Sequence, residues 1–126
     1  MTNEIRILVA DDFEDWRVRI RQLLSFRPAW RIVAEAPDGL EAVQKAAELR
    51  PDVVLLDIQM PGLNGIEAAR RIRQDCPGSR IIFLSQSSDK EIIRAALEIG
   101  AKAFVQKAMA ARELIPAIEA ALHDDH

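Results

Sequence analysis

The sequence predicts an α/β fold in which five parallel strands alternate with five helices and form one sheet covered on both faces. Short apolar runs recur along the chain, and each is followed by a segment whose apolar residues repeat at helical spacing. Residues 53–56 are four consecutive aliphatic residues, which is typical of a parallel strand buried on both faces. Strands that alternate with helices through right-handed crossovers place helices on both sides of a parallel sheet.

The composition limits the class of protein. A chain of 126 residues is one domain that buries about two-thirds of its unfolded surface, so we expect a single domain over 1–126, with its core at about 4–122 and a polar tail at 123–126. No apolar run has membrane length, and no signal peptide is visible. The single Cys76 excludes an internal disulfide and fits a reducing cytoplasm. A net charge of −3 argues against direct contact with nucleic acid.

The first strand is predicted at residues 5–10, a β-rich run that ends in two acids. Residues 13–26 follow as a helix because their apolar side chains recur at helical spacing. Phe13 and Trp16 form an aromatic pair on this stripe, which we interpret as core packing rather than a ligand site.

The second strand, residues 31–35, is followed by a helix that a capping box begins, with Asp38 as the cap and Glu41 three residues later. The buried face of this second helix is predicted to consist of Leu40, Val43, Ala46, Ala47 and Leu49. The central strand, residues 53–56, comes next and ends in the carboxylate Asp57.

The third and fourth helices carry the same start signal, a capping residue with a glutamate three positions later. The two pairs are Asn64 with Glu67 and Ser88 with Glu91. The third helix ends before Pro77, and the fourth ends at Gly100. Between them lies the fourth strand, residues 80–85, an apolar run that ends in a hydroxyl.

The fifth strand is predicted at residues 101–106, with the cation Lys107 at its end. The fifth helix runs to about Leu122, and its start has no conventional capping side chain. We expect Pro116 to lie near the first turn of this helix, where a missing N–H group is tolerated.

Four of the five strands end in polar residues. These residues are Asp11, Asp12, Asp57, Ser85 and Lys107. The carboxyl ends of parallel strands meet at one edge of the sheet, where α/β proteins bind ligands. Taken alone, Asp57 is equally well interpreted as a turn or cap aspartate, and Ser85 is better interpreted as a cap. Together, three carboxylates, a hydroxyl and an ammonium group indicate a functional site.

The chemistry of this set points to phosphoryl transfer. Three neighbouring acids repel one another unless a cation is bound, and oxygen ligands select a hard cation such as Mg²⁺. A carboxylate can attack phosphorus, and the transferring group then needs positive charge and donors around its oxygens. Mg²⁺, Lys107 and Ser85 supply these, so the central Asp57 is the predicted nucleophile.

In order and spacing, these residues resemble the response-regulator receiver domain of two-component signalling, essentially from end to end. The matching residues are Asp11-Asp12, Asp57-Ile58-Gln59-Met60-Pro61-Gly62, Ser85 and Lys107. Residues 50–57 and 62–68 are most similar to receivers that precede a helix-turn-helix output domain. The alternating elements have the flavodoxin-like, doubly wound (βα)5 layout, and the resemblance implies the strand order 2-1-3-4-5.

The resemblance also implies roles for single residues. Asp57 accepts a phosphoryl group from the phosphohistidine of a sensor histidine kinase or a phosphotransfer protein in a phosphorelay. Asp12, Asp57 and the backbone carbonyl of Gln59 ligate Mg²⁺, and Asp11 acts through water. Phe104 matches the switch aromatic, an interpretation that we favour over that of a plain edge-strand packing residue.

For the chain as a whole, the resemblance implies a signalling switch rather than an enzyme, since it catalyses only its own phosphorylation and dephosphorylation. Phosphorylation, sensed by Ser85 and Phe104, is expected to change a surface made by the fourth helix, fifth strand and fifth helix. That surface binds an output domain, a protein partner or a second copy of the chain.

Two positions depart from the family pattern. Gln86 replaces a small residue next to Ser85, and Ala108 replaces a proline that commonly follows the lysine in a cis peptide. A cis bond before alanine costs about 2.5–4 kcal/mol, so we expect a trans bond. Gln59 and Gln86 flank the path of the water that removes the phosphoryl group, which makes them a predicted pocket gate.

Three rival functions are weighed against this interpretation. An aspartate-nucleophile phosphatase has an Asp-x-Asp motif, but in this sequence Gln59 occupies the position of the second acid. A flavin binder needs a phosphate-binding loop after the first strand, and the acidic residues 11–15 would repel a phosphate. The third rival is a structural adaptor that never takes phosphate. Phosphorylation of the chain by a small phosphodonor would exclude it.

Overall fold

The computed structural model describes residues 4–123 and contains one parallel sheet in the order β2-β1-β3-β4-β5, as expected. The strands are β1 (Ile5–Ala10), β2 (Trp30–Ala36), β3 (Val53–Leu56), β4 (Arg80–Ser85) and β5 (Ala103–Gln106). The helices are α1 (Glu14–Leu24), α2 (Gly39–Leu49), α3 (Gly65–Asp75), α4 (Lys90–Glu98), the 3₁₀ turn η1 (Lys107–Met109) and α5 (Ala110–His123). His123 was predicted to begin the polar tail, but it is the last residue of α5. The other predicted tail residues, 124–126, lie outside the described part.

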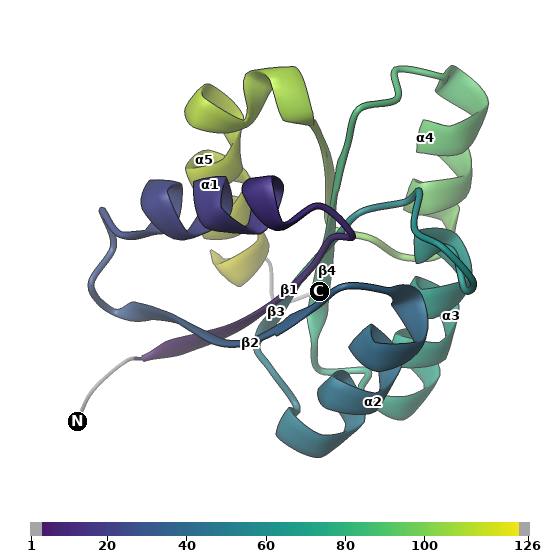
Figure 1. Ribbon diagram of the computed structural model, residues 1–126, viewed down its shortest axis with the longest axis horizontal. Helices are drawn as coiled ribbons and strands as arrows, with labels where there is room; N and C mark the ends of the chain where they lie inside the picture. Colours follow the sequence, from purple (N-terminus) through teal and green to yellow (C-terminus); the bar gives the residue numbers. More distant parts are fainter. Residues whose placement is uncertain (1–3, 124–126) are drawn as a thin grey trace.

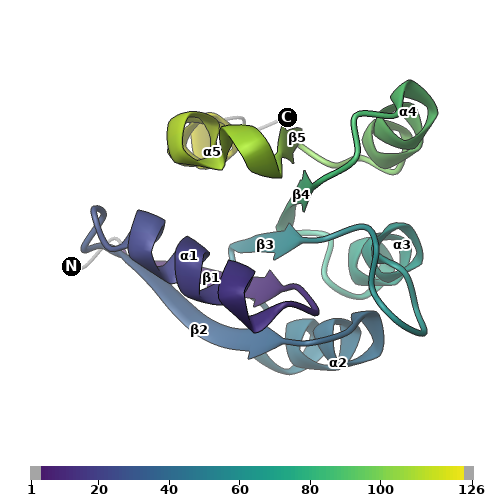
Figure 2. The same cartoon turned by 45° about the horizontal axis from the view of Figure 1, so that its top comes forward.

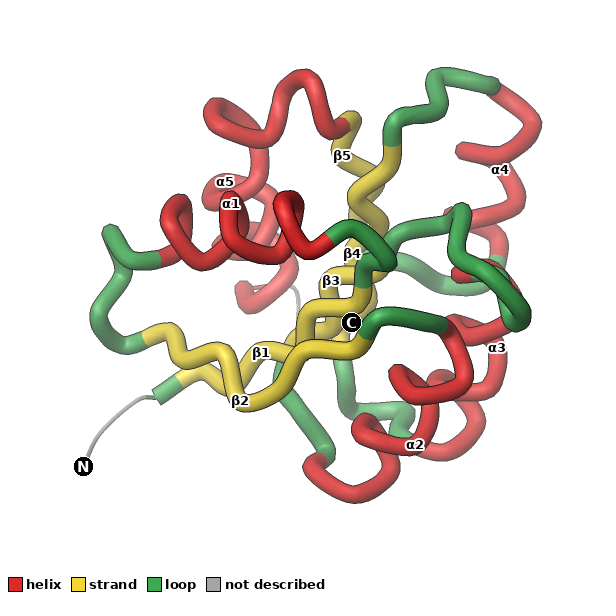
Figure 3. The backbone as a smooth tube through the Cα atoms, in the orientation of Figure 1, coloured by secondary structure: helices red, strands yellow, loops and turns green. Residues whose placement is uncertain are grey.

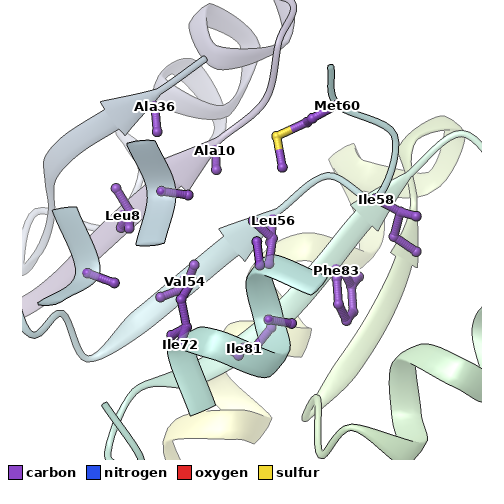
Figure 4. Close-up of a cluster of buried hydrophobic side chains, with 14 of the residues drawn as sticks. Leu8, Ala10, Ala36, Val54, Leu56, Ile58, Met60, Ile72, Ile81 and Phe83 are labelled. Atoms are coloured by element: carbon purple, nitrogen blue, oxygen red, sulfur yellow. The ribbon is translucent and has the colours of Figure 1, made fainter. Parts of the chain in front are cut away.

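The helices cover both faces of the sheet. Helices α1 and α5 lie on one face, and α2, α3 and α4 lie on the other (Figures 1 and 2). The central strand β3 alternates between the two cores: Val54 and Leu56 pack toward α2 and α3, as Figure 4 shows, and Val53 and Leu55 pack toward α1 and α5. Burying such side chains fully stabilises the fold by about 1.5–3 kcal/mol each. No helix within the described residues is long and apolar enough to cross a membrane.

Two of the three predicted N-cap residues are confirmed. The side chains of Asp38 and Asn64 accept hydrogen bonds at 2.8 and 2.9 Å from the backbone N–H three residues later. The prediction for Ser88 is wrong, because Asp89 is the N-cap of α4 and its carboxylate accepts from the Glu91 N–H at 2.9 Å. A carboxylate is a stronger acceptor than a hydroxyl and also complements the positive end of the helix dipole.

Some apolar residues that were predicted to be buried lie in solvent. Phe13 precedes α1 as its N-cap and is 58% exposed, so only Trp16 of the predicted aromatic pair packs against the core. On α2, Leu40 and Ala47 are exposed, Ala46 is buried as predicted, and Ala42 is buried although it was not predicted to be. The helix therefore packs closely through small residues, an orientation that spacing alone does not decide.

The start of α5 differs from the prediction. The helix begins at Ala110 after the turn η1, so Pro116 lies inside the helix and not near its first turn. Pro116 is exposed, so its ring lies on the outer face of the helix, away from the core. The expected trans bond before Ala108 is confirmed, and the described residues contain no cis peptide bond.

Trp30 is the first residue of β2, one position before the predicted strand. It pairs with Ile5 of β1, and the guanidinium of Arg27 lies 5.7 Å from its ring centroid. Because the strands are parallel, Trp30 lies at the edge of the sheet opposite the strand ends that carry the candidate site.

Candidate functional site

The strand register brings the predicted polar residues to one edge of the sheet. Ala10, Leu56 and Phe83 lie side by side in neighbouring strands; β1 and β3 end at this level, and β4 continues two residues further to Ser85 (loops green in Figure 3). The N–H of Asp57 donates to the carbonyl of Ala10 at 2.9 Å, which ties the end of β3 to the end of β1. The acids of these two strands are therefore neighbours because of backbone pairing.

A glycine allows the loop after β3 to turn sharply into α3. The N–H of Gly65 donates to the carbonyl of Ile58 at 2.7 Å, and a Cβ atom at position 65 would lie 2.0 Å from the backbone oxygen of Asp57. A larger residue would have to displace the backbone that carries the carboxylate. Gly65 thus positions Asp57 by letting the helix start approach it.

Three carboxylates converge at this edge. One oxygen of each of Asp11, Asp12 and Asp57 lies within 4.8 Å of the others. Asp11 and Asp57 are buried, and Asp12 is half-buried. Oδ1 of Asp12 is buried with no hydrogen-bond partner, which is costly for a carboxylate oxygen. A bound cation would satisfy this oxygen, and a donor set of oxygens fits a hard divalent ion.

Lys107 lies among these acids. Its Nζ is 2.8 Å from Oδ2 of Asp11 and 3.4 Å from Oδ2 of Asp57, and its side chain is only 3% exposed. It is the first residue of η1 and not the last of a strand. One ammonium group faces three carboxylates, so a negative imbalance remains at the site.

Asp11 differs from Asp12 in having both side-chain oxygens engaged. Oδ1 accepts from the N–H of Phe13 at 2.9 Å, and Oδ2 contacts Lys107. The guanidinium of Arg17 donates to the backbone carbonyl of Asp11 at 2.6 Å. These contacts hold Asp11 in place, whereas Oδ1 of Asp12 is buried without a hydrogen-bond partner.

The carboxyl group of Asp57 is hard to ionise. Burial, and after it the charge of Asp11, raise its pKa from 3.8 to about 6. The Lys107 ammonium and the N–H of Gln59, 3.4 Å from Oδ1, act in the opposite direction. Without metal, ionised Asp57 is therefore destabilised at this site, and a bound cation would stabilise it.

This shift predicts that Asp57→Asn stabilises the metal-free protein at neutral pH. Because the folded state binds the Asp57 proton more tightly than the unfolded chain, stability falls as the pH rises from about 4 to about 6. Removing the charge should raise the free energy of unfolding by up to about 3 kcal/mol above that range. Urea unfolding with a chelator present measures the gain.

The gain should disappear below about pH 4, where the carboxyl group is protonated in both states. Asp75→Asn, which removes an exposed acid at the end of α3, serves as the matched control and should leave stability unchanged. An Asp57→Asn gain that persists at low pH would contradict the assigned cause.

The other predicted site residues line the same edge without contacting the acids through their side chains. Ser85 is buried, and its Oγ accepts from the N–H of Ser87 at 3.2 Å. Phe104 is half-buried and tilted against Phe83, with 6.5 Å between ring centroids. Gln59 and Gln86 are both exposed.

An open groove of about 740 Å³ reaches the acid cluster at Asp12. It runs from Asp12 and Gln59 along the loop after β3 to Ile92 on α4, with Asp89 and Glu91 also among its lining residues. The cluster is therefore open to solvent at Asp12.

Sequence reasoning missed one neighbour of the site. Trp16 was interpreted only as core packing, but its ring centroid lies 4.9 Å from Nζ of Lys107. The available signal was its position one helical turn after Asp12, which places it next to the end of β1.

The chain was compared with known proteins. The family model of the response regulator receiver domain matches residues 7–119. Transcriptional regulatory protein DegU of Brevibacillus brevis is 35% identical over 117 residues, which cover 93% of this chain and 50% of that protein. Transcriptional regulatory protein LiaR of Bacillus subtilis is 38% identical over 117 residues, or 93% of this chain and 56% of that protein. The structure of the response regulator domain of Thermotoga maritima CheB has a TM-score of 0.91 at 36% identity and covers 98% of this chain and 100% of that chain. The chain thus spans about half the length of the curated relatives it matches.

Proposed function

Because this chain belongs to the response regulator receiver domains of two-component signalling, we propose that Asp57 is the residue that accepts its phosphoryl group. Phosphoryl transfer with Mg²⁺ is general to this family. The observation that carries the assignment is the place of Asp57 at the end of the central strand β3, in the acid cluster and 3.4 Å from Nζ of Lys107. Labelling with acetyl phosphate, which should place one phosphoryl group on Asp57, tests the proposal.

In the proposed reaction, a carboxylate oxygen of Asp57 attacks the phosphorus of a phosphohistidine on a histidine kinase or phosphotransfer protein. The new O–P bond forms as the P–N bond breaks, and the donor imidazole leaves with the bonding electron pair and takes up a proton. Asp57 must be ionised to attack, so its raised pKa favours reaction only when positive charge is nearby. Lys107 supplies part of that charge to the phosphoryl oxygens, and the hydroxyl of Ser85 supplies a donor.

Asp12, Asp57 and the backbone carbonyl of Gln59 would hold the Mg²⁺ ion, with Asp11 acting through water. The unpartnered oxygen of Asp12 and the engaged oxygens of Asp11 support this division. When bound, the ion would neutralise charge on the carboxylates and on the transferring phosphoryl group.

The proposed output is a change in the surface made by α4, β5 and α5, with Ser85 and Phe104 as its switch residues. The half-buried Phe104 lies on β5 within this surface. The partner is an output domain, another protein or a second copy of the chain, and the regulator relatives favour control of transcription. The described residues form one receiver unit that acts in the cytoplasm, as a switch without a substrate of its own and without direct contact to nucleic acid.

Gln86 is expected to lengthen the lifetime of the phosphorylated state. Its exposed side chain lies one residue after Ser85, beside the path of the attacking water, and it is bulkier than the small residue usual in the family. Gln86→Ala should open this path and speed dephosphorylation by roughly tenfold, which corresponds to about 1.4 kcal/mol in the barrier. Loss of radiolabel after removal of the phosphodonor measures the rate.

Gln59→Ala is the companion variant, since the Gln59 amide is placed to orient the water. It should slow dephosphorylation, the opposite of the effect expected for Gln86→Ala. An unchanged or slower rate in Gln86→Ala would contradict the obstructing role.

A further inference from the structure

The ammonium group of Lys107 rests on an aromatic ring that the proposed chemistry does not use. Nζ lies 4.9 Å from the ring centroid of Trp16, while its two carboxylate contacts lie at 2.8 and 3.4 Å. The Lys107 side chain is 3% exposed, and Trp16 is half-buried among residues of the α1 and α5 core. Water is therefore largely excluded between the cation and the ring, a condition that strengthens their attraction.

The ring differs from the carboxylates in carrying no net charge. An ammonium group held by a carboxylate is partly neutralised, so the carboxylate competes with an incoming phosphoryl group for it. The electron-rich face of an indole attracts the cation without that competition and without repelling a phosphoryl group. Trp16 is thus suited to hold Lys107 in both states of Asp57.

The contact also joins two parts of the fold. Trp16 lies in the first turn of α1, and Lys107 begins the turn η1 that leads into α5. The residue after Lys107, Ala108, is exposed and contributes little packing that would direct the lysine. The contacts of Nζ therefore direct the Lys107 side chain. Two of these contacts are carboxylates, and the Trp16 ring is the uncharged one.

We propose that Trp16 is a positioning residue whose indole face holds the Lys107 ammonium beside Asp57, ready to contact the phosphoryl group. The role rests on the proposed function, because Lys107 acts on a group that Asp57 must first accept. Trp16 itself contacts neither Asp57 nor the phosphoryl donor in this scheme.

Stepwise fluorination of Trp16 tests the proposal with little change in side-chain shape. In a Trp30→Phe background, Trp16 is the only tryptophan, so 4-fluoro-, difluoro- and trifluorotryptophan enter at this position alone. Each fluorine withdraws electron density from the ring face. The rate at which acetyl phosphate labels Asp57 should fall progressively, by about three- to tenfold over the series. Trp30→Phe alone should leave the rate unchanged, since Trp30 lies at the opposite edge of the sheet.

Lys107→Met provides the second arm. Without the ammonium group, labelling is slower, and fluorination of Trp16 should no longer change its rate. An effect of equal size with and without Lys107 would show a packing role and overturn the proposal.

The experiment distinguishes a failure of the Trp16 role from a failure of the phosphoacceptor role of Asp57. If Asp57 is labelled at the same rate with and without fluorine on Trp16, the role of Trp16 is overturned, and the assignment of Asp57 as phosphoacceptor stands. Native protein that takes up no phosphoryl group overturns the proposed function and, with it, this role for Trp16.

Discussion

Asp57→Asn is expected to abolish phosphoryl incorporation completely. The amide of asparagine lacks the anionic oxygen that attacks phosphorus, while its size and its ability to accept from the Gln59 N–H are kept. Incubation with acetyl phosphate and Mg²⁺, followed by intact-mass spectrometry, should show one added phosphoryl group on the native chain and none on the variant. Peptide mapping after borohydride reduction should place the native label at residue 57.

The matched control is Asp75→Asn, which makes the same chemical change at an exposed position at the end of α3. It should be labelled like the native chain. Because the Asp57 variant is expected to gain stability, a loss of labelling cannot be attributed to unfolding. Labelling that survives in Asp57→Asn, on Asp12 or elsewhere, would contradict the assignment of the nucleophile.

Removing divalent metal is expected to stop labelling, and Asp12→Ala is expected to weaken Mg²⁺ binding by about a hundredfold or more. The reason is the buried Oδ1 of Asp12, which has no partner of its own and would bind the ion directly. Isothermal calorimetry measures the affinity. Fluorescence of Trp16 provides a second signal, because metal binding at the acids changes the electrostatic surroundings of the Lys107 ammonium above the ring.

Asp15→Ala serves as the control for Asp12→Ala, since Asp15 is an exposed acid in the first turn of α1 and lies outside the cluster. It should bind Mg²⁺ like the native chain. Affinity should also fall as the pH drops below about 6, where the metal-free Asp57 carboxyl becomes protonated. Calorimetry that detects no Mg²⁺ binding to the native chain would contradict the metal site.

The sequence predicted the fold well because short local patterns of residues indicate each strand and helix. A run such as residues 53–56 has no polar alternation, so its burial on both faces follows from composition alone. The same locality explains the capping predictions for Asp38 and Asn64. It also explains the miss at Ser88, where two adjacent capping residues compete and the geometry of the loop before α4 favours Asp89.

By itself, the sequence also determined that three acids, a serine and a lysine lie at strand ends, and thus which residues share one edge of the sheet. Tertiary structure alone decided how they meet. It placed Lys107 closer to Asp11 than to Asp57, left Oδ1 of Asp12 without a partner, and raised the pKa of Asp57 by burial. It also put Trp16 beneath the ammonium group. Such distances depend on side chains from elements far apart in the chain, and burial depends on everything packed around them, so no local pattern encodes them.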